Sequence, residues 1–552
     1  METMNGTHTS SGPAQWWRSP PLRLYVAAFV GSVITSLIAS YHVPISSDQA
    51  SILLEADAFR HGNVLLHGWV LPADNFLFTS IPIYAIAISL FGISNTVFHV
   101  LPPLFFGILT ALMVWHARYE ENTVPKRRTV TILLLLLILF PSCAGLYPGI
   151  TIVFIEHVAT LIGILLSWLL LRLMRGGRSS RSRALLTAGA GVILGLTTAS
   201  DPFAVFLFGL PFLLMIGHDA ILKAHPPLRI REGCTVICAL IAGLALPVAA
   251  HHLGGFSTEQ PLAHFAALSS VPLRAGRFIT YLFMVSGSPF WGGSIRSITT
   301  LVALAHGILL LGIVIAVVAA SAAWLRSRST SETATLLSLG CGITTLALLA
   351  SQQLQQGTER YVLLVLVLSL PVAASYGASW LLSRSLSSWV LPAVLVLTGM
   401  TMLAGYAPAV HRSHTAATAA AAFLTAHHLS SGFSDYWDAA AVTVASRDTV
   451  TITPVFAFGS TPRIVPQTFL ADSAWLRKPG ASGTWFVLVN PQETGYGITP
   501  AVLEHSFGAP AATYHVNSLL IEVWHRNLPG IISRSYADAL SHGPVPPLPS
   551  AA

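Results

Sequence analysis

Charged residues are scarce in this sequence. Only 9% of its 552 residues are Asp, Glu, Lys or Arg, whereas an average soluble domain carries about 25%. So few charges exclude a water-soluble globular protein of this size, and they also exclude a disordered chain and a coiled coil. Because 53% of the residues are hydrophobic and the mean hydropathy is +0.67, we expect a mainly α-helical polytopic membrane protein.

Cysteine is equally rare, and its four copies form no disulfide framework. They lie within or at the ends of apolar segments: Cys143, Cys234, Cys238 and Cys341. Cys234 and Cys238 are one helical turn apart, but nothing nearby completes a metal site. We therefore expect these thiols to fill space between membrane helices, and we expect no metal and no cofactor.

The net charge of +7 does not indicate a nucleic-acid partner. The arginines form short clusters between apolar runs instead of a basic stripe with interleaved aromatic residues. Such clusters are typical of cytoplasmic loops in membrane proteins. We expect contacts with membrane lipid and none with nucleic acid.

The apolar runs predict about eleven membrane spans, because runs of this length cross about 30 Å of hydrocarbon. They fall near residues 24–41, 97–116, 129–145, 150–171, 184–199, 202–217, 233–250, 299–324, 333–350, 360–380 and 388–408. The first run lacks a cleavage pattern and follows Arg18 and Arg23, which indicates a retained anchor with a cytoplasmic N-terminus. No internal repeat is visible, which argues against a transporter built from inverted repeats.

The assignment of sides depends on the apolar stretch 80–92. It is short and contains Pro82, so we expect a helix that lies in the membrane interface. The basic clusters then fall on the cytoplasmic side, among them those around Lys126, Arg175, Arg229, Arg326 and Arg384. If 80–92 crossed the membrane, all of these clusters would face outward, against the positive-inside rule.

The predicted organisation follows from these spans. Residues 1–23 form a cytoplasmic N-terminus, 24–408 a membrane domain with an outer loop at 42–96, 409–542 a periplasmic α/β or α+β domain, and 543–552 a disordered tail. Within the periplasmic domain, 414–428 is expected to be helical, and alternation in 449–457 and in Trp485–Val489 predicts strands. The segment 435–446 fits either a helix or a strand.

The outer loop holds the first candidate for chemistry. Ser47 or Asp48 caps a predicted helix that runs to about Phe59. Asp48 and Glu55 are seven residues apart and share a face of that helix. A carboxylate just outside a span, under an interfacial helix, is placed to accept a proton from a hydroxyl group. The alternative is that Asp48 only caps the helix and Glu55 belongs to a solvated face.

Three more candidates lie at the same predicted membrane face. Glu156 and His157 are near the outer end of a span, where ionisable residues usually face a cavity. Asp201 stands between two spans and is either functional or a turn-forming cap. Arg360, beside Tyr361 at the start of a span, either binds a lipid phosphate or anchors the span. Three arginines of the loop 251–298 add anion-binding capacity: Arg274, Arg277 and Arg296.

These features together resemble the GT-C polytopic glycosyltransferases, above all the protein O-mannosyltransferases and the lipid A aminoarabinose transferases. The resemblance covers about residues 20–410 and rests on the early Asp48, an interfacial helix that ends in Leu90-Phe91-Gly92, and basic-flanked spans. The segment Gly432–Ala440 also resembles a pattern in the outer domains of uncharacterised members. The sequence departs from the family in having Asp48-Gln49 in place of paired acids, and in lacking a Glu-Lys-Pro-Pro stretch.

The resemblance implies an inverting glycosyltransferase that takes sugar from a polyprenyl-phosphate donor at the outer face of a bacterial inner membrane. The predicted catalytic residues are Asp48 and Glu156, which the resemblance supports. The predicted substrate-binding residues are His157, Arg360 and Tyr361, which the resemblance also supports, and Glu55 and Asp201, which come from the residue pattern alone. The acceptor is a glycan, a lipid or a protein. The alternatives from other classes are a transporter or flippase of lipid-linked sugars and a non-catalytic membrane assembly factor.

Overall fold

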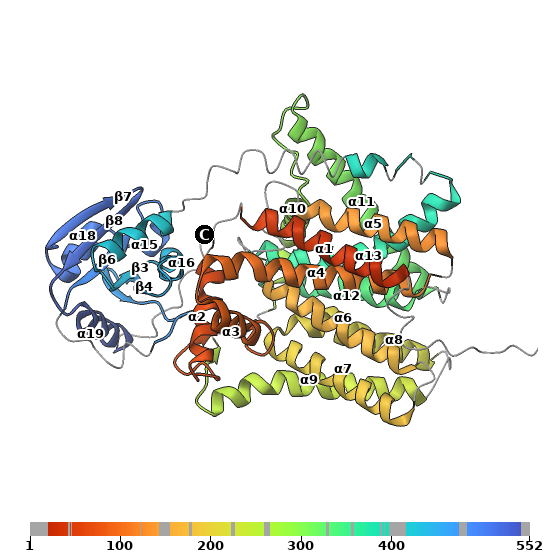
Figure 1. Cartoon of the computed structure of the whole chain (residues 1–552), viewed down its shortest axis with the longest axis horizontal. Coiled ribbons are helices and arrows are strands. Elements are labelled where there is room, and N and C mark those ends of the chain that lie inside the picture. Colours follow the sequence, from red (N-terminus) through yellow and green to blue (C-terminus); the bar gives the residue numbers. More distant parts are fainter. Residues whose placement is uncertain are drawn as a thin grey trace, which may run out of the picture.

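The computed structural model describes residues 20–41, 45, 47–121, 123–142, 155–175, 179–221, 227–258, 265–326, 331–354, 358–386, 389–390, 392–396, 416–473 and 483–541. In this part of the chain, long helices form a bundle, and a sheet with its own helices lies beyond one end of the bundle (Figure 1). The sheet and its helices are called the C-terminal domain below.

The bundle and its loops contain thirteen α-helices among the described residues. They are α1 (Pro20–Ser40), α2 (Ser47–Arg60), α3 (Ser80–Phe91), α4 (Asn95–Tyr119), α5 (Val124–Ser142), α6 (Ile155–Arg175), α7 (Ser180–Ser200), α8 (Leu210–Ile221), α9 (Pro227–His252), α10 (Val271–Val285), α11 (Ile298–Leu325), α12 (Glu332–Ala350) and α13 (Glu359–Ser383). A π-helical turn, η3 (Val205–Gly209), leads into α8.

Helix α3 is short, because its 12 residues extend only about 18 Å along the helix axis. This is less than the thickness of the hydrocarbon layer. One side of α3 is buried through Ile81 and Ile88, whereas Ile86 and Leu90 are exposed. The helix lies beside α2 at the end of the bundle nearest the C-terminal domain (Figure 1). Its length and its apolar exposed side suit the interfacial position predicted for 80–92.

Within the described part of the chain, eight helices are long and apolar enough to cross a membrane: α1, α4, α6, α7, α9, α11, α12 and α13. Each overlaps one of the eleven expected spans, so the prediction of a polytopic helical membrane protein is confirmed. Of the three other expected spans, 129–145 corresponds to α5 and 202–217 to η3 with α8. Most of 388–408 lies outside the described residues, as do the N-terminal residues 1–19 and the predicted tail 543–552.

The C-terminal domain is built on a six-stranded sheet of order β5-β4-β3-β6-β8-β7. Its strands are β3 (Ser431–Ser434), β4 (Thr451–Phe458), β5 (Arg463–Pro466), β6 (Trp485–Val489), β7 (Ala512–Val516) and β8 (Leu519–Trp524). Its helices are α15 (Ala416–Ala426), α16 (Tyr436–Ala445), α18 (Pro500–Phe507) and α19 (Leu528–Ser541). The two predicted strands are β4 and β6, and the segment 435–446 contains helix α16. The domain contains both helices and strands, and its helix between the parallel strands β3 and β4 corresponds to the α/β alternative of the two expected.

Side chains of β6 alternate between two apolar layers, which explains its sequence. Phe486 and Leu488 pack in the layer that includes residues of α15 and α16, whereas Val487 and Val489 pack in the layer that includes residues of α18 and α19. Successive residues of a strand point to opposite faces of a sheet. A strand covered on both faces therefore needs apolar residues at every position, as in Trp485–Val489.

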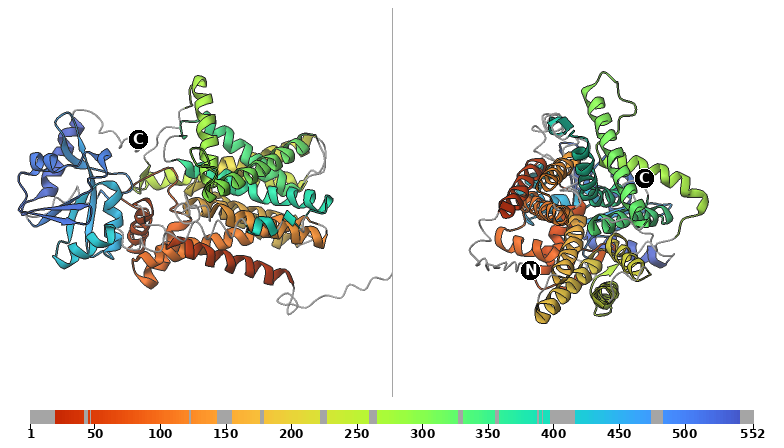
Figure 2. Two further views of the ribbon diagram at one scale, coloured as in Figure 1. Left: turned by 90° about the horizontal axis from the view of Figure 1, so that it is seen from above. Right: turned by 90° about the vertical axis from the view of Figure 1, so that its right-hand side faces the viewer.

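The C-terminal domain contacts the bundle through the loop that follows α1. Ala440 and Val444 of α16 belong to one buried apolar cluster with residues of α2 and α3. Beyond α2, the short strand β1 (Val70–Leu71) pairs with β2 (Ser257–Thr258), which follows α9. The backbone N–H of Leu470 also donates to the carbonyl of Val70 at 2.8 Å. Figure 2 shows α2 and its neighbours between the bundle and the domain.

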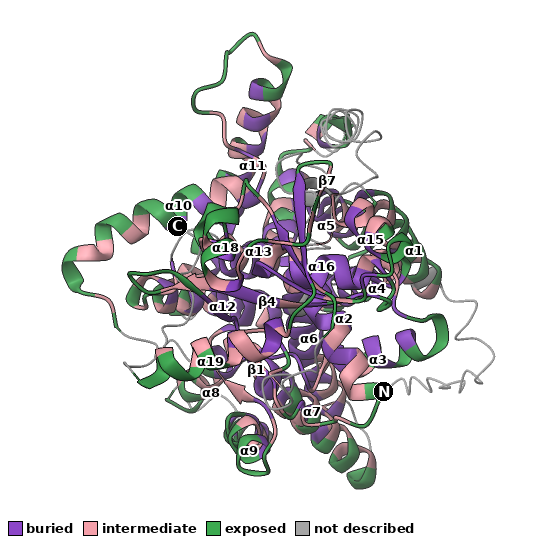
Figure 3. Ribbon diagram, turned by 90° about the vertical axis from the view of Figure 1, so that its left-hand side faces the viewer, coloured by how far each residue is buried: buried purple, intermediate pink, exposed green. Residues whose placement is uncertain are grey.

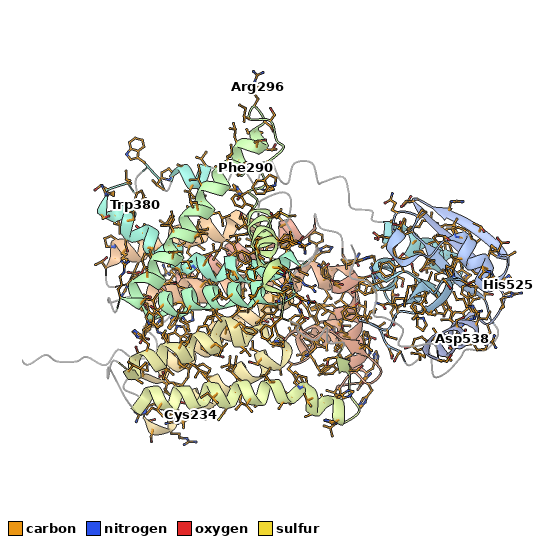
Figure 4. All side chains as sticks on the ribbon, turned by 180° about the vertical axis from the view of Figure 1, so that it is seen from behind. Cys234, Phe290, Arg296, Trp380, His525 and Asp538 are labelled. Atoms are coloured by element: carbon orange, nitrogen blue, oxygen red, sulfur yellow. The ribbon has the colours of Figure 1, made fainter. Side chains whose placement is uncertain are left out.

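The opposite end of the bundle is held by ion pairs between helices. The guanidinium of Arg175, in the last turn of α6, makes two hydrogen bonds of 2.7 Å to the buried carboxylate of Glu232 on α9. Arg172, one turn earlier, pairs with Glu120 at 2.6 Å. Cys234 of α9 marks this end, away from the C-terminal domain (Figure 4). Arg172 and Arg175 thus form a charged network at one end of α6. His157 lies near the other end of the same helix, about 27 Å away along its axis.

Apolar side chains that face outward are abundant on α10 and α11, in contrast to the buried centre of the bundle (Figure 3). Leu273 and Ile279 of α10 are exposed, as are Leu301 and Ile308 of α11. A large apolar surface of this kind requires a lipid environment or a partner. It supports the membrane assignment made from hydropathy.

Close approach of α12 to the π-helical turn generates a prediction about stability. A Cβ atom on Gly340 would lie 2.4 Å from the carbonyl oxygen of Leu207, whereas a Cβ on Gly342 would meet nothing within 4 Å. We expect Gly340→Ala to lower the unfolding free energy by about 1–3 kcal/mol, because backbone must move to admit the methyl group. Gly342→Ala on the same helix is the control and should not destabilise. Thermal unfolding in detergent measures both, and equal midpoints would contradict the packing described.

Candidate functional site

Two residues from distant parts of the sequence meet where the bundle faces the C-terminal domain. Nη1 of Arg360, the second residue of α13, lies 3.5 Å from Oδ2 of Asp48, the second residue of α2. Both side chains are about one-third exposed, at 30% and 35%. An acidic residue in the first turn of a helix is favoured by the helix dipole, whereas a cation there is disfavoured. Arg360 therefore needs the carboxylates around it.

The other oxygen of Asp48 is occupied by the C-terminal domain. The phenol of Tyr436, the first residue of α16, donates a hydrogen bond to Oδ1 of Asp48. The neighbouring Ser47 donates from Oγ to the carbonyl oxygen of Trp437 at 2.7 Å. Burial and the negative charge of Asp48 raise the pKa of Tyr436 well above its ordinary value, so the phenol keeps its proton and acts as the donor.

A second polar group is buried next to this pair. Oδ2 of Asp201 accepts hydrogen bonds from Oγ1 of Thr160 at 2.7 Å and from Nδ1 of His157 at 3.1 Å. Its Oδ1 accepts the backbone N–H of Phe203 at 2.9 Å. Asp201 is completely buried at the end of α7. Three donors replace the water that this carboxylate has lost, and they fix the orientation of the imidazole of His157.

Asp74 joins the two groups. Its Oδ2 lies 3.8 Å from Nε2 of His157, and its charge interacts with Arg360. Burial raises the pKa of Asp74 above its ordinary value, although the positive charges of Arg360 and His157 act in the opposite direction. The site thus contains carboxylates from the first loop and from the end of α7, one guanidinium and one imidazole.

Aromatic rings surround these polar groups on the membrane side. Tyr361 stacks on Phe203 with 4.8 Å between ring centroids and meets the ring of His157 at 5.6 Å. The guanidinium carbon of Arg360 lies 5.3 Å from the centre of the Tyr361 ring. A cavity of about 20 Å³ adjoins His157, and its other lining side chains are apolar residues of α4, α6 and α13. This is room for about one water molecule, so the described residues pack closely below the site.

The structure brings together five of the seven predicted site residues: Asp48, His157, Asp201, Arg360 and Tyr361. Glu55 is buried on α2, and its predicted role in substrate binding stays a prediction. Glu156 is the second residue of α6, but its side chain lies outside the described residues. The arginines Arg274 and Arg277 donate to the backbone carbonyls of Ser351 and Leu354.

Sequence reasoning missed Asp74 and Tyr436. Asp74 lies in a loop between Pro72 and Asn75, without a helical or strand period to place it. Tyr436 lies in the segment Gly432–Ala440, to which the family resemblance assigns no role. Among the described residues, no group of three or more His, Cys, Asp or Glu side chains is arranged to hold a metal ion.

Comparison with known proteins gives a similarity of fold. No protein-family model and no curated protein sequence matches the chain. Among solved structures, that of ArnT from Cupriavidus metallidurans bound to undecaprenyl phosphate is similar, with a TM-score of 0.50 and 12% sequence identity. The similarity covers 93% of this chain and 98% of ArnT. The chain therefore has the fold of ArnT, a lipid A aminoarabinose transferase of GT-C type, and the predicted resemblance in fold is confirmed.

The hydrogen bonds of Asp201 generate a prediction about stability. An amide offers one acceptor oxygen where the carboxylate uses two, so Asp201→Asn leaves a buried donor unsatisfied. We expect a loss of about 2 kcal/mol in unfolding free energy. Thr160→Val removes only one donor and should cost about 1 kcal/mol. Thermal unfolding in detergent ranks the two variants, and an Asp201→Asn variant as stable as the wild type would contradict the network.

Proposed function

We propose that this protein is a membrane glycosyltransferase that transfers a sugar from a polyprenyl-phosphate-linked donor to an acceptor at the periplasmic face of a bacterial inner membrane. The contact between Asp48 and Arg360 carries the proposal. A carboxylate can accept a proton and a guanidinium can bind phosphate, and the fold resembles that of a protein seen bound to undecaprenyl phosphate.

Arg360 is the proposed ligand of the donor phosphate. Its Nε is buried and has no hydrogen-bond partner among the described residues, so the guanidinium keeps a donor for a phosphate oxygen. A guanidinium binds phosphate through two parallel hydrogen bonds. Tyr361 and Phe203 hold the apolar side of this position, and the cluster of Asp74, His157 and Asp201 supports it from below.

Asp48 is the proposed general base. The acceptor O–H gives its proton to the Asp48 carboxylate while its oxygen forms a bond to the anomeric carbon of the sugar. The bond from that carbon to the phosphate oxygen breaks, and the polyprenyl phosphate leaves with the electron pair. Arg360 stabilises the negative charge on the leaving phosphate. Attack opposite to the leaving group inverts the configuration. Glu156 is proposed as a second catalytic acid, with Glu55 contributing to substrate binding.

The proposed side of the membrane follows from the two ends of the bundle. Basic residues such as Arg172 and Arg175 lie in the last turn of α6, and His157 lies at its other end, in the site. Basic loops favour the cytoplasmic side. This distribution supports the proposal that the site and the C-terminal domain face the periplasm and that the N-terminus is cytoplasmic.

Replacement of Asp48 tests the proposed reaction. We expect Asp48→Asn to reduce sugar transfer from a polyprenyl-phosphate donor at least 100-fold, because the amide does not accept the proton of the acceptor. The measurement uses membrane fractions with radiolabelled donor. Asp57→Asn on the same helix is the control, since Asp57 pairs with Arg60 at 2.6 Å outside the site. Full transfer by Asp48→Asn would show that Asp48 is not the base. If the wild type transports lipid-linked sugar but does not transfer it, the flippase alternative is favoured. If the wild type shows neither activity, an assembly factor is favoured.

A second prediction concerns the donor phosphate. Arg360→Lys keeps the charge but loses the planar fork, so we expect the KM for the donor to rise about tenfold. Arg384→Lys, at the other end of α13, is the matched control and should keep the wild-type KM. Initial rates at varied donor concentration give both values. An unchanged KM in Arg360→Lys would remove Arg360 from the phosphate site.

A further inference from the structure

The sheet of the C-terminal domain has a point at which its strand order reverses. β3 pairs in parallel with β4 on one side and with β6 on the other. The chain leaves β3 through α16 to reach β4, and it later returns as β6 on the opposite side of β3. In open α/β sheets, ligands bind at the carboxyl ends of the two strands that flank such a reversal. In this domain those ends are Ser434 of β3 and Val489 of β6.

Polar side chains follow both of these strand ends. They are called the acceptor cluster: Asp435, Tyr436, Asp438, Asn490, Glu493 and Tyr496. Asp435 caps α16 by accepting the backbone N–H of Trp437 at 2.8 Å. Asn490 donates to Oδ2 of Asp438 at 2.9 Å, which links the segment after β6 to that after β3.

The acceptor cluster lies against the proposed catalytic residue. The phenol of Tyr436 donates to Asp48, as described above. The carboxylates of Asp48 and Asp435 also act on the phenol of Tyr496. The carboxyl ends of β3 and β6 therefore face the position at which an acceptor hydroxyl has to lie during the reaction.

One member of the cluster, Tyr496, has a hydroxyl group that makes no hydrogen bond to a described residue. Tyr496 is only 9% exposed. Burial and the nearby carboxylates, first that of Asp435, raise the pKa of Tyr496, so the hydroxyl keeps a proton to donate. Because the carboxyl groups of Asp435, Asp48 and Glu493 all act on it, this hydroxyl belongs to the cluster and can donate to a ligand atom there.

Charge separates the two sides of the site. Arg360 stands toward the membrane, where the donor phosphate is proposed to bind. On the side of the C-terminal domain, Asp435, Asp438 and Glu493 bring three carboxyl groups and no described cation pairs with them. Carboxylates repel phosphate and accept hydrogen bonds from hydroxyl groups. The amide of Asn490 and the phenols of Tyr436 and Tyr496 add uncharged hydrogen-bond donors and acceptors.

We infer that the acceptor cluster is the acceptor subsite, and that it binds the hydroxyl groups of a neutral carbohydrate. The inference rests on the proposed function, because only a transferase has an acceptor. Binding of the carbohydrate to the cluster does not itself require that sugar is transferred. The terminal sugar of a glycan lies between β3 and β6 and presents one hydroxyl to Asp48, in the place that the Tyr436 phenol takes in this structure. A phosphorylated acceptor is disfavoured, because no described cation pairs with the carboxyl groups of the cluster to bind a phosphate.

A binding experiment on an array tests the inference. Labelled full-length protein in lipid nanodiscs is applied to neutral glycans, phosphorylated glycans, and peptides that contain Ser and Thr. We expect retention by neutral glycans alone. Tyr496→Phe and Asn490→Ala should each weaken retention about three- to tenfold, the range for loss of one hydrogen bond. Tyr514→Phe on β7 is the matched control, because it removes a phenol from the same domain away from the cluster, and it should bind like the wild type. Unfolding midpoints of all variants confirm that they are folded.

The outcomes separate the two proposals. Retention by phosphorylated glycans or by peptides instead of neutral glycans overturns the inference, as does the absence of any retention or a Tyr496→Phe variant that binds like the wild type. The Asp48→Asn variant is expected to bind neutral glycans while it fails to transfer sugar. If the wild type binds neutral glycans but transfers no sugar from any polyprenyl-phosphate donor, the proposed function fails and the carbohydrate subsite stands.

Discussion

A carboxylate in the first loop and a guanidinium at the start of α13 are joined across 312 residues of sequence, and the surroundings of the site depend on this pair. Arg360 lies at a helix N-terminus, where the dipole opposes a cation, so its position requires negative charge from other elements. Asp48 supplies it from α2, and Asp74 supplies it from the loop that follows. Each carboxylate then has its own second partner, Tyr436 for Asp48 and His157 for Asp74. The pair thus connects the loop, the bundle and the C-terminal domain.

The two ends of the bundle use charge differently. At the end remote from the C-terminal domain, Arg175 is matched by Glu232 through two hydrogen bonds and by Glu332 through a third. Such an arrangement fixes α6 against α9 and α12 and leaves few donors free. At the site, Arg360 has a looser contact of 3.5 Å and an unused Nε. A guanidinium that is fully paired stabilises helices, whereas one with a free donor is available to a ligand.

Much of the fold and part of the site could be predicted from the sequence. Long apolar runs predict helices through hydropathy alone, and the alternation of 449–457 predicts β4, because both signals are local. Asp48, Asp201 and Arg360 stand out because charge is rare beside apolar segments. Asp74 and Tyr436 do not, since their importance comes from the docking of a loop and a separate domain onto α13 and α2. The predicted span at 202–217 corresponds to a π-helical turn followed by a shorter helix, a detail that hydropathy does not reveal.

The position of Tyr436 has a consequence for the synthesis and membrane insertion of the protein. Asp48 and Tyr436 are 388 residues apart, and the chain is made from its N-terminus onward. During synthesis, Asp48 leaves the ribosome early, and the membrane helices that follow can insert before the C-terminal domain exists. The carboxylate acquires its phenol partner only after α16 has been translated and the domain has docked on α2. A nascent chain therefore carries an incomplete site while its membrane helices insert. The site is completed only when the C-terminal domain folds and Tyr436 contacts Asp48.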